Sequence, residues 1–383
     1  MLRKFALEQD IQRRIKNAQA IMKEKSIGAL FIPAQGAPNM MGVAKYFTNL
    51  QLWAGTAWVV LGSEHHEPAL VQTSTYGTDW NRQEASTSWV ENPSPDALGR
   101  AIEICKEFTK KENKIGIVNL NTTWKVGDWT RIQNELLIDG RNSIDITIDI
   151  NKLRSIKSNF EIEEIYRTGK LHCAGLERFA EVARPGGRCW DAAAAAEEVL
   201  RSQGCFWGRS KFSFDLGPHT IPTTLDRRFT EDDIIVFELV YTGPLGYWDE
   251  MTALFSFKPL PDDVKKQLEA QEKVIQACSV AMKAGTKIGK MHEIASETWQ
   301  EEGYEVIGKH TPNCHSIGLD DEDGPSSWFT PDEILKPNMV LSFHPSTLLK
   351  GNRAFLISDN FLVTSEGAVP LSPRDWLYRK IEV

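Results

Sequence analysis

The sequence predicts a two-domain protein, with an α/β domain over residues 1–152 and an α+β domain over residues 153–383 that contains an internal repeat. Three observations predict this fold class. Short apolar strands alternate with helices in the first part, a polar and basic stretch then interrupts that pattern, and the second part repeats one order of elements. A chain of 383 residues is long enough to bury two cores.

Apolar periodicity defines the elements of the first domain. Ile11, Ile15 and Ala18 recur at helical spacing, and the continuous apolar run at 27–33 is expected to form a buried strand. A helix is expected near 96–110. Further strands are expected at 56–61, 68–72, 114–120 and 144–150. The domain contains neither a GxGxxG sequence nor a Walker loop, so no motif predicts nucleotide binding.

The second domain follows the polar stretch at 153–158 and opens with a long helix near Glu161. A glycine loop and helix at 184–203 are matched by 283–302, and the strand at 231–238 is matched by 336–344. The strand at 248–257 is matched in turn by 354–364. Two such copies are expected to form a curved sheet backed by helices, with equivalent polar positions facing each other across a pseudo-twofold axis. Two copies make a duplicated domain and not a solenoid.

Composition and charge exclude several classes of function. The 52 acidic and 44 basic residues give a net charge of −8, and no long basic run offsets it, which argues against nucleic-acid binding. No stretch approaches the roughly 18 apolar residues of a membrane span. The N-terminus leads into a charged helix and not into an apolar signal core, so a cytoplasmic protein is expected. The six cysteines form no CxxC pair and are expected to be free thiols.

Ionisable residues near the ends of the repeated strands form the candidate site. They are Glu238, Asp249, Glu250, His219, His315, His344 and Asp359. Burying such a group at the close of an apolar strand is costly unless it is paired or binds a ligand. Successive strand residues point to opposite faces, so only one of Asp249 and Glu250 can face the site. The acidic run at 320–323 is expected to be a solvated loop, and His172 is expected to be structural.

Short motifs in a fixed order carry a family resemblance. They are LRSIKS from 153 with EI from 161, PH from 218, GY from 246 with Thr252, HSIGLD from 315 with GP from 324, and LKPNMV from 335. Through them the second domain resembles the creatinase/prolidase/methionine-aminopeptidase (M24) superfamily, known for its pita-bread fold. The whole chain is similar to the two-domain members, whose N-terminal domain is creatinase-like. The resemblance implies a homodimer and a small-molecule substrate.

The resemblance also implies a metal-ligand pattern that this sequence changes. Peptidases of the superfamily hold two metal ions with two Asp, one His and two Glu ligands. In that order the positions fall on Glu238, on Glu250 or Asp249, on His315, on His344 and on Ser358. Two cations close together need bridging carboxylates to offset their repulsion, and here a histidine and a serine replace two of them. A di-metal centre is therefore not expected.

The first hypothesis is a metal-independent, creatinase-like hydrolase of a C–N bond in a small cationic or zwitterionic substrate. His219 matches the proton-handling histidine of creatinase and would act as base and then as acid. Glu238 and Glu250, with His315, complete the expected catalytic set. The expected substrate contacts are His344, Asp249, Tyr247, Trp248 and Phe343.

Two alternatives remain open. One iron, zinc or manganese ion held by a mixed nitrogen and oxygen set would give an Xaa-Pro peptidase-like hydrolase or a lyase, such as a dimethylsulfoniopropionate lyase. The ligands would then be Glu238, Asp249, His315, His344 and Asp359. The superfamily also includes pseudo-peptidases that bind proteins, so a non-catalytic binding protein is the other alternative.

Overall fold

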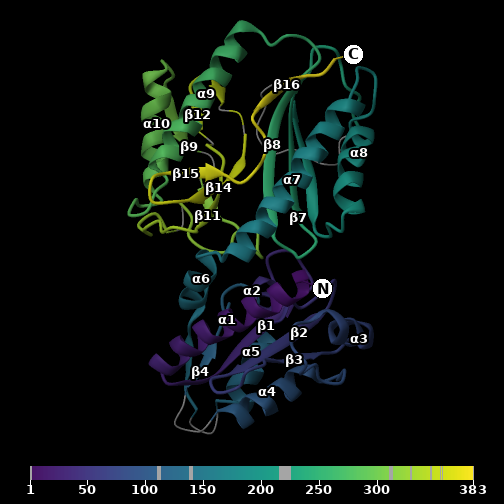
Figure 1. Ribbon diagram of the computed structural model, residues 1–383, viewed down its shortest axis with the longest axis vertical. Helices are drawn as coiled ribbons and strands as arrows, with labels where there is room; N and C mark the ends of the chain where they lie inside the picture. The colour runs from purple at the N-terminus through teal and green to yellow at the C-terminus, as the bar shows by residue number, and fades with distance from the viewer. Residues whose placement is uncertain are drawn as a thin grey trace. The chain divides into compact units, whose positions relative to one another are not determined.

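The computed structural model describes residues 2–109, 114–137, 141–214, 226–309, 314–327, 330–345, 347–353, 355 and 357–382. The chain divides into two compact units, Met1–Arg154 and Ser155–Val383, which run from purple to blue and from teal to yellow in Figure 1. Within the described ranges, no helix combines the length and the apolar character that crossing a membrane requires.

The N-terminal unit is built on a five-stranded mixed sheet in the order β3-β2-β1-β4-β5. The strands are β1 (Ile27–Gln35), β2 (Thr56–Gly62), β3 (Ala69–Gln72), β4 (Lys114–Ile117) and β5 (Ser143–Asp145). The helices are α1 (Leu2–Glu24), α2 (Gly42–Thr48), α3 (Thr75–Glu84), α4 (Ala97–Phe108) and α5 (Val126–Glu135). The central strand β1 pairs antiparallel with β2 and parallel with β4, and its Phe31 packs with Trp58 and Ile104 in a buried core. The predicted α/β alternation is thus confirmed.

The prediction of a strand at 144–150 in this unit is wrong. The strand β5 ends at Asp145, and the helix α6 (Thr147–Ser155) follows it. The Asp145 carboxylate accepts hydrogen bonds from the backbone N–H and the hydroxyl of Thr147, at 2.8 and 2.6 Å. Such a cap satisfies a free backbone donor at the start of a helix. The cap therefore outweighs the alternating isoleucines that suggested a strand.

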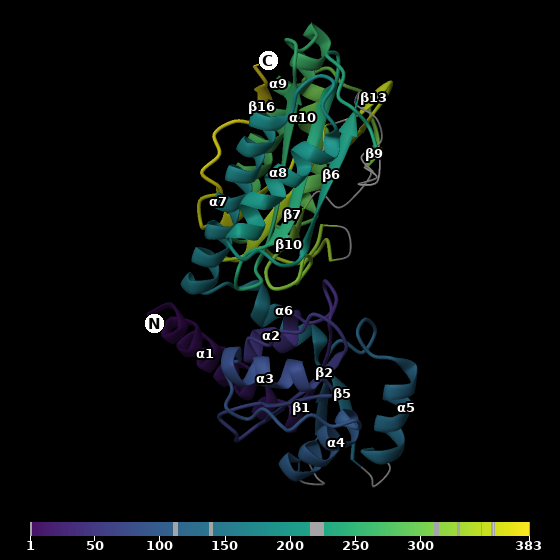
Figure 2. The same cartoon turned by 90° about the vertical axis from the view of Figure 1, so that its right-hand side faces the viewer.

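The C-terminal unit opens with the long helix α7 (Asn159–Val182), whose start is set by a capping box. The Glu161 N–H donates to the Ser158 hydroxyl at 3.1 Å, and the Ser158 N–H donates to the Glu161 carboxylate at 3.0 Å. The first half of the unit continues with α8 (Cys189–Ser202), β6 (Gly208–Phe214), β7 (Ile234–Thr242) and β8 (Trp248–Ser256). In Figure 2 the helices α7 and α8 cover one face of these antiparallel strands.

The second half repeats this order of helix, helix and antiparallel strands. It consists of α9 (Asp262–Ala281), α10 (Lys290–Glu301), β10 (Cys314–Ser316), β11 (Val340–Phe343), β14 (Asp359–Val363) and β15 (Ala368–Pro370). A small sheet of β9 (Val306–Lys309), β12 (Thr347–Leu349) and β13 (Asn352–Arg353) is inserted, and β16 (Tyr378–Lys380) joins β8 in parallel. The predicted duplication is confirmed, and its two copies form separate four-stranded sheets, β16-β8-β7-β6 and β10-β11-β14-β15.

The two four-stranded sheets meet at a seam formed by Thr252, Ser358 and Arg374. The Thr252 N–H donates to the Ser358 carbonyl at 3.2 Å, and the two hydroxyl oxygens are 2.7 Å apart. The Arg374 guanidinium donates to the carbonyl oxygens of Thr252 and Ser358 at 2.6 and 3.0 Å, and also to the Asp359 carboxylate at 3.1 Å. Its side chain is 1% exposed. One buried cation therefore ties the two halves of the duplicated unit together.

Replacing Arg374 by methionine should destabilise the C-terminal unit by about 3 kcal/mol, because two carbonyls lose a donor and the half-buried Asp359 loses its cationic partner. The free energy of unfolding in urea measures this loss. The matched control is Arg178→Met, which removes an exposed ion pair with Glu181 and should change stability by less than about 0.5 kcal/mol. Equal stability of the two variants would show that the seam does not depend on Arg374.

Candidate functional site

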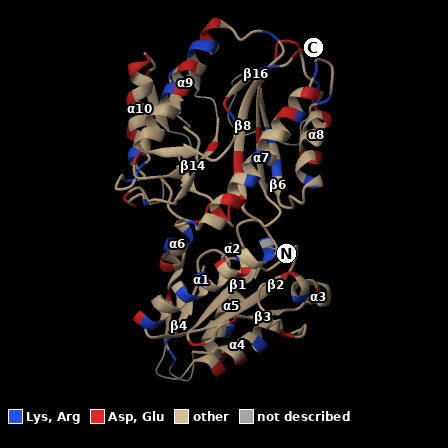
Figure 3. Ribbon diagram, viewed as in Figure 1, with Lys and Arg blue, Asp and Glu red and all other residues tan. Residues whose placement is uncertain are grey.

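Strand register decides which acidic residues share a face. In Figure 3 the strands of the C-terminal unit carry few charged residues, whereas its helices carry many. Glu238 in β7 lies opposite Thr252 in β8, and Glu250 is two residues before Thr252. Glu238 and Glu250 therefore point to the same face, while Asp249 points to the other. The sequence left open whether Asp249 or Glu250 faces the site, and strand register places Glu250 on the face that carries Glu238.

Glu250 is the centre of a cluster that both halves of the unit supply. The Ser342 hydroxyl donates to Glu250 Oε2 at 2.8 Å. The Nε2 atoms of His315 and His344 lie 3.5 and 3.9 Å from the same oxygen. His315 is paired with Ser342 in the β10–β11 ladder, and His344 follows β11 directly, so one strand pair positions all three partners. The two imidazole rings are 5.2 Å apart at an angle of 57°.

The charges within this cluster depend on one another. Burial alone would raise the pKa of Glu250, but the neighbouring His315 and His344 hold that pKa well below its usual range. Burial alone would lower the pKa of His315, but the Glu250 carboxylate raises it to about 9. Burial and the charge of His315 lower the pKa of His344 to about 4. At neutral pH the metal-free cluster is therefore an ion pair of Glu250 with His315, beside a neutral His344.

Glu238 lies on the same face but has a different partner. Its carboxylate is 2.6 Å from Lys211 Nζ, an ion pair set up by the direct pairing of Lys211 with Glu238 in the β6–β7 ladder. Burial raises the pKa of Glu238, and Glu250 adds to this effect while Lys211 opposes it. Lys211 was not predicted from the sequence. The strand β6 was not predicted either, and only its pairing with β7 places a lysine opposite a buried glutamate.

Asp249 and Asp359 lie outside the Glu250 cluster. Asp249 is 1% exposed, accepts a hydrogen bond from Asn360, and lies 3.2 Å from Nδ1 of the buried His172. Burial and the charge of Asp359 raise the pKa of Asp249 well above its usual range. Asp359 pairs with Arg374 at the seam. His172 itself is held by hydrogen bonds with the Thr168 carbonyl and the Tyr241 N–H.

The remaining predicted residues have other environments. His219 lies outside the described residues. The side chains of Tyr247, Trp248 and Phe343 are buried, at 2%, 2% and 1% exposed, and Phe343 packs in the core of the second half. Their burial gives these aromatic rings a packing role. Phe343 also lines a cavity of about 380 Å³ between α9 and β14.

The expectation that residues 320–323 form a solvated loop is wrong. Asp321 and Asp323 are 6% and 4% exposed. Both Asp323 oxygens are 3.1 Å from the Nζ atom of Lys157, a lysine whose side chain has no exposed surface. Asp321 lies 3.4 Å from Arg209, and burial together with the charge of Glu250 raises the pKa of Asp321 well above its usual range. Basic partners distant in sequence explain why an acidic run is buried here.

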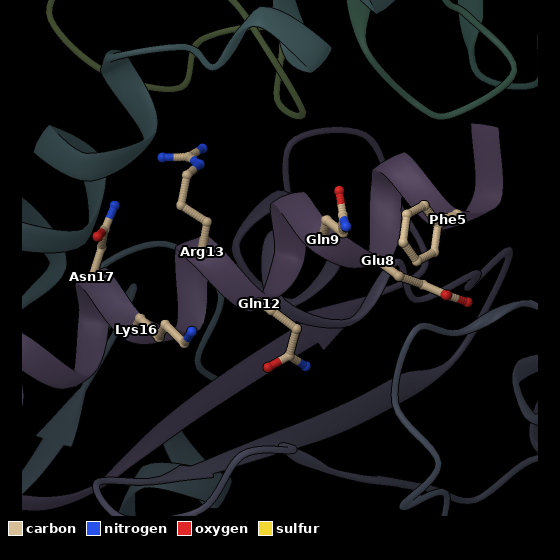
Figure 4. Close-up of a pocket in the computed structure, with 7 residues that line it drawn as sticks. All are labelled: Phe5, Glu8, Gln9, Gln12, Arg13, Lys16 and Asn17. Carbon is tan, nitrogen blue, oxygen red and sulfur yellow. The ribbon is translucent and has the colours of Figure 1, made fainter. Parts of the chain in front are cut away.

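A hollow of about 480 Å³ lies along α1 in the N-terminal unit, and Figure 4 shows the side chains that line it. They are Phe5, Glu8, Gln9, Gln12, Arg13, Lys16 and Asn17. All of them come from one helix and project along its length, so they do not converge on a single point. The Glu250 cluster, by contrast, joins side chains from different strands.

The Glu250 cluster suits one divalent cation. One donor atom each from Glu250, His315 and His344 can be chosen so that all three lie within 4.8 Å of one another, and no other such group occurs in the described ranges. Nδ1 of His344 is buried and has no hydrogen-bond partner among the described residues. Two imidazoles and one carboxylate are ligands that zinc, iron and manganese accept. This set shares His315 and His344 with the expected ligands and has Glu250 as its carboxylate.

Comparisons with known proteins agree with this architecture. Among solved structures, an Xaa-Pro dipeptidase from Bacillus anthracis matches 96% of this chain and 100% of its own, with a TM-score of 0.78 and 18% identity. Dipeptidase PepE from Mycobacterium ulcerans matches 98% and 99%, with a TM-score of 0.79 and 18% identity. At this level of identity the likeness shows the fold, and it confirms the predicted pita-bread architecture.

Sequence relatives extend the comparison. An uncharacterized peptidase of Staphylococcus aureus is 26% identical over 240 residues, which cover 58% of this chain and 64% of the relative. A probable dipeptidase PepE of Mycobacterium bovis is 26% identical over 229 residues, covering 58% and 60%. The chain therefore matches less than two thirds of the length of these relatives. The model of metallopeptidase family M24 matches residues 163–365, which confirms the predicted superfamily of hydrolases. The chain belongs to metallopeptidase family M24.

Proposed function

We propose that the chain is a hydrolase of a C–N bond that works with one divalent metal ion, held by Glu250, His315 and His344. The observation that supports this most strongly is the convergence, within 4.8 Å, of donor atoms from the buried Glu250 and His315 and the half-buried His344. Membership of a family of metallopeptidases supports it further. The metal-independent reaction expected from the sequence relies on His219, which lies outside the described residues.

The residues around the centre have separable roles in this proposal. When bound, the ion supplies Lewis acidity toward the carbonyl of the scissile bond. Ser342 orients Glu250 through its 2.8 Å hydrogen bond. Glu238 lies on the same face, and burial raises its pKa, which suits a group that accepts a proton from water and returns it to the leaving nitrogen.

The proposed substrate is a dipeptide or a similarly small zwitterionic amide. Similarity to an Xaa-Pro dipeptidase and to dipeptidase PepE supports this class. A dipeptide also satisfies the expectation of a small zwitterionic substrate. Hydrolysis of Xaa-Pro dipeptides, compared with non-proline dipeptides and simple amides, tests the class. Turnover that is absent for every substrate with manganese, zinc and iron supplied would contradict it.

A metal-free hydrolase is the second candidate, and one observation favours it. The ion pair between Glu250 and His315 balances its own charge without a cation. Activity before and after treatment with a chelator separates the two candidates. Loss on chelation with recovery on adding the metal supports the metal centre, while full activity in metal-free protein supports the second candidate.

Replacing a ligand should weaken metal binding far more than it affects folding. Glu250→Gln or His344→Ala should lower the affinity for Mn²⁺ by about 100-fold, because each removes one of three donors. Titration calorimetry with Mn²⁺ measures the change. The control Glu305→Gln removes an exposed carboxylate paired with Lys350 and should bind as the unchanged chain does. A Glu250→Gln variant with unchanged affinity would place the metal elsewhere.

Metal affinity should also rise with pH. The pKa of His315 is raised to about 9 in the metal-free chain, so at neutral pH this imidazole carries a proton that a metal ion must displace. One proton is released per ion bound, and the affinity for Mn²⁺ should therefore increase about tenfold per pH unit between pH 6.5 and 8.5. Calorimetry in buffers of different ionisation enthalpy counts the released proton. An affinity independent of pH over this range would argue against His315 as a ligand.

A further inference from the structure

The face that carries the proposed metal centre also carries a fixed cation. Lys211 Nζ lies 2.6 Å from the Glu238 carboxylate, and the side chains of Lys211 and Glu238 are 24% and 4% exposed. A mostly buried ammonium beside a buried carboxylate is held more firmly than a surface pair, because little water competes for either group. In the metal-free chain this ion pair therefore places a cation at Glu238.

Register places this pair next to the centre. Lys211 lies opposite Glu238 in the β6–β7 ladder, and Glu238 lies opposite Thr252 in the β7–β8 ladder. Glu250 is the diagonal same-face neighbour of Glu238, a separation that long side chains can span. The electrostatics agree, since Glu250 raises the pKa of Glu238 and Lys211 helps to lower the pKa of His344.

Two carboxylates that are diagonal neighbours on one face are a potential second cation site. Glu238 and Glu250 offer oxygen ligands of the kind that bridge paired divalent ions. In the structure the ammonium of Lys211 already neutralises Glu238. A second divalent ion would have to displace that ammonium from a buried carboxylate and would also meet the repulsion of the first ion.

We infer that Lys211 is the resident second cation of this site: it restricts the centre to one metal ion and keeps Glu238 outside the coordination shell. The inference rests on the proposed metal centre and specifies its stoichiometry. Lys211 is a positioning residue, since it acts through Glu238. Its ammonium has three donor hydrogens, so it can bind Glu238 and still donate to a substrate oxygen.

Metal stoichiometry tests the inference directly. Co²⁺ is titrated by calorimetry into the full chain after chelator treatment and dialysis, and bound cobalt is counted by elemental analysis. The unchanged chain should bind one ion. Lys211→Met should bind two ions. The second should bind with a dissociation constant below about 1 mM, which corresponds to a binding free energy more favourable than about −4 kcal/mol. The double variant Lys211→Met with Glu238→Gln should return to one ion, because the freed carboxylate is gone.

Two further variants control for charge and for folding. Lys211→Arg keeps the cation and should bind one ion. Lys258→Met removes an exposed lysine paired with Asp232 and should also bind one ion. Glu238→Gln alone should change the affinity for the first ion by less than about threefold, because Glu238 is not among its ligands.

The outcomes separate this inference from the proposed function. One ion in both the unchanged chain and a folded Lys211→Met variant would overturn the role of Lys211 and leave the metal centre in place. Two ions in the unchanged chain, with the second lost in Glu238→Gln, would overturn it as well. No bound ion in the unchanged chain would overturn both the metal centre and this inference.

Discussion

The candidate site depends on the seam between the two halves of the C-terminal unit. Glu250 lies two residues before Thr252, whereas Ser342, His315 and His344 belong to the second half. The Thr252–Ser358 contacts and the Arg374 guanidinium hold the two sheets together, so that side chains from both halves can meet at the site. Neither half alone contains both the Glu250 carboxylate and the two imidazoles. The site therefore forms only when the two halves pack together.

The sequence predicts the parts of this arrangement that follow from local pattern. Apolar runs ending in Glu238 and His344 marked two equivalent strands, and both residues lie at or beside the site. Alternation showed that Asp249 and Glu250 face opposite sides, but not which of the two shares a face with Glu238. That choice depends on the pairing of Glu238 with Thr252, which only strand register reveals.

Long-range pairing accounts for what the sequence did not predict. Lys157 and Asp323 are 166 residues apart, so nothing in the local sequence shows that the acidic run has a buried basic partner. Lys211 lies in a polar strand where a lysine ordinarily faces water. The prediction of a strand at 144–150 is wrong for a local reason. The Asp145 carboxylate accepts a hydrogen bond from the N–H of Thr147, two residues later, and this favours the start of a helix over a continued strand. Burial of charge is decided by partners, and partners are a property of the fold.

Charge balance favours a single ion in the proposed metal centre. In the metal-free chain, each of the two glutamates on the shared face has its own cation, Lys211 for Glu238 and protonated His315 for Glu250. Binding one divalent ion at Glu250 displaces only a proton from His315. Binding a second would also break the pair of Lys211 with Glu238, and separating a buried pair costs about 3 kcal/mol or more. The histidine is the exchangeable cation of the pair, because an imidazole loses its proton near neutral pH far more readily than a lysine ammonium does.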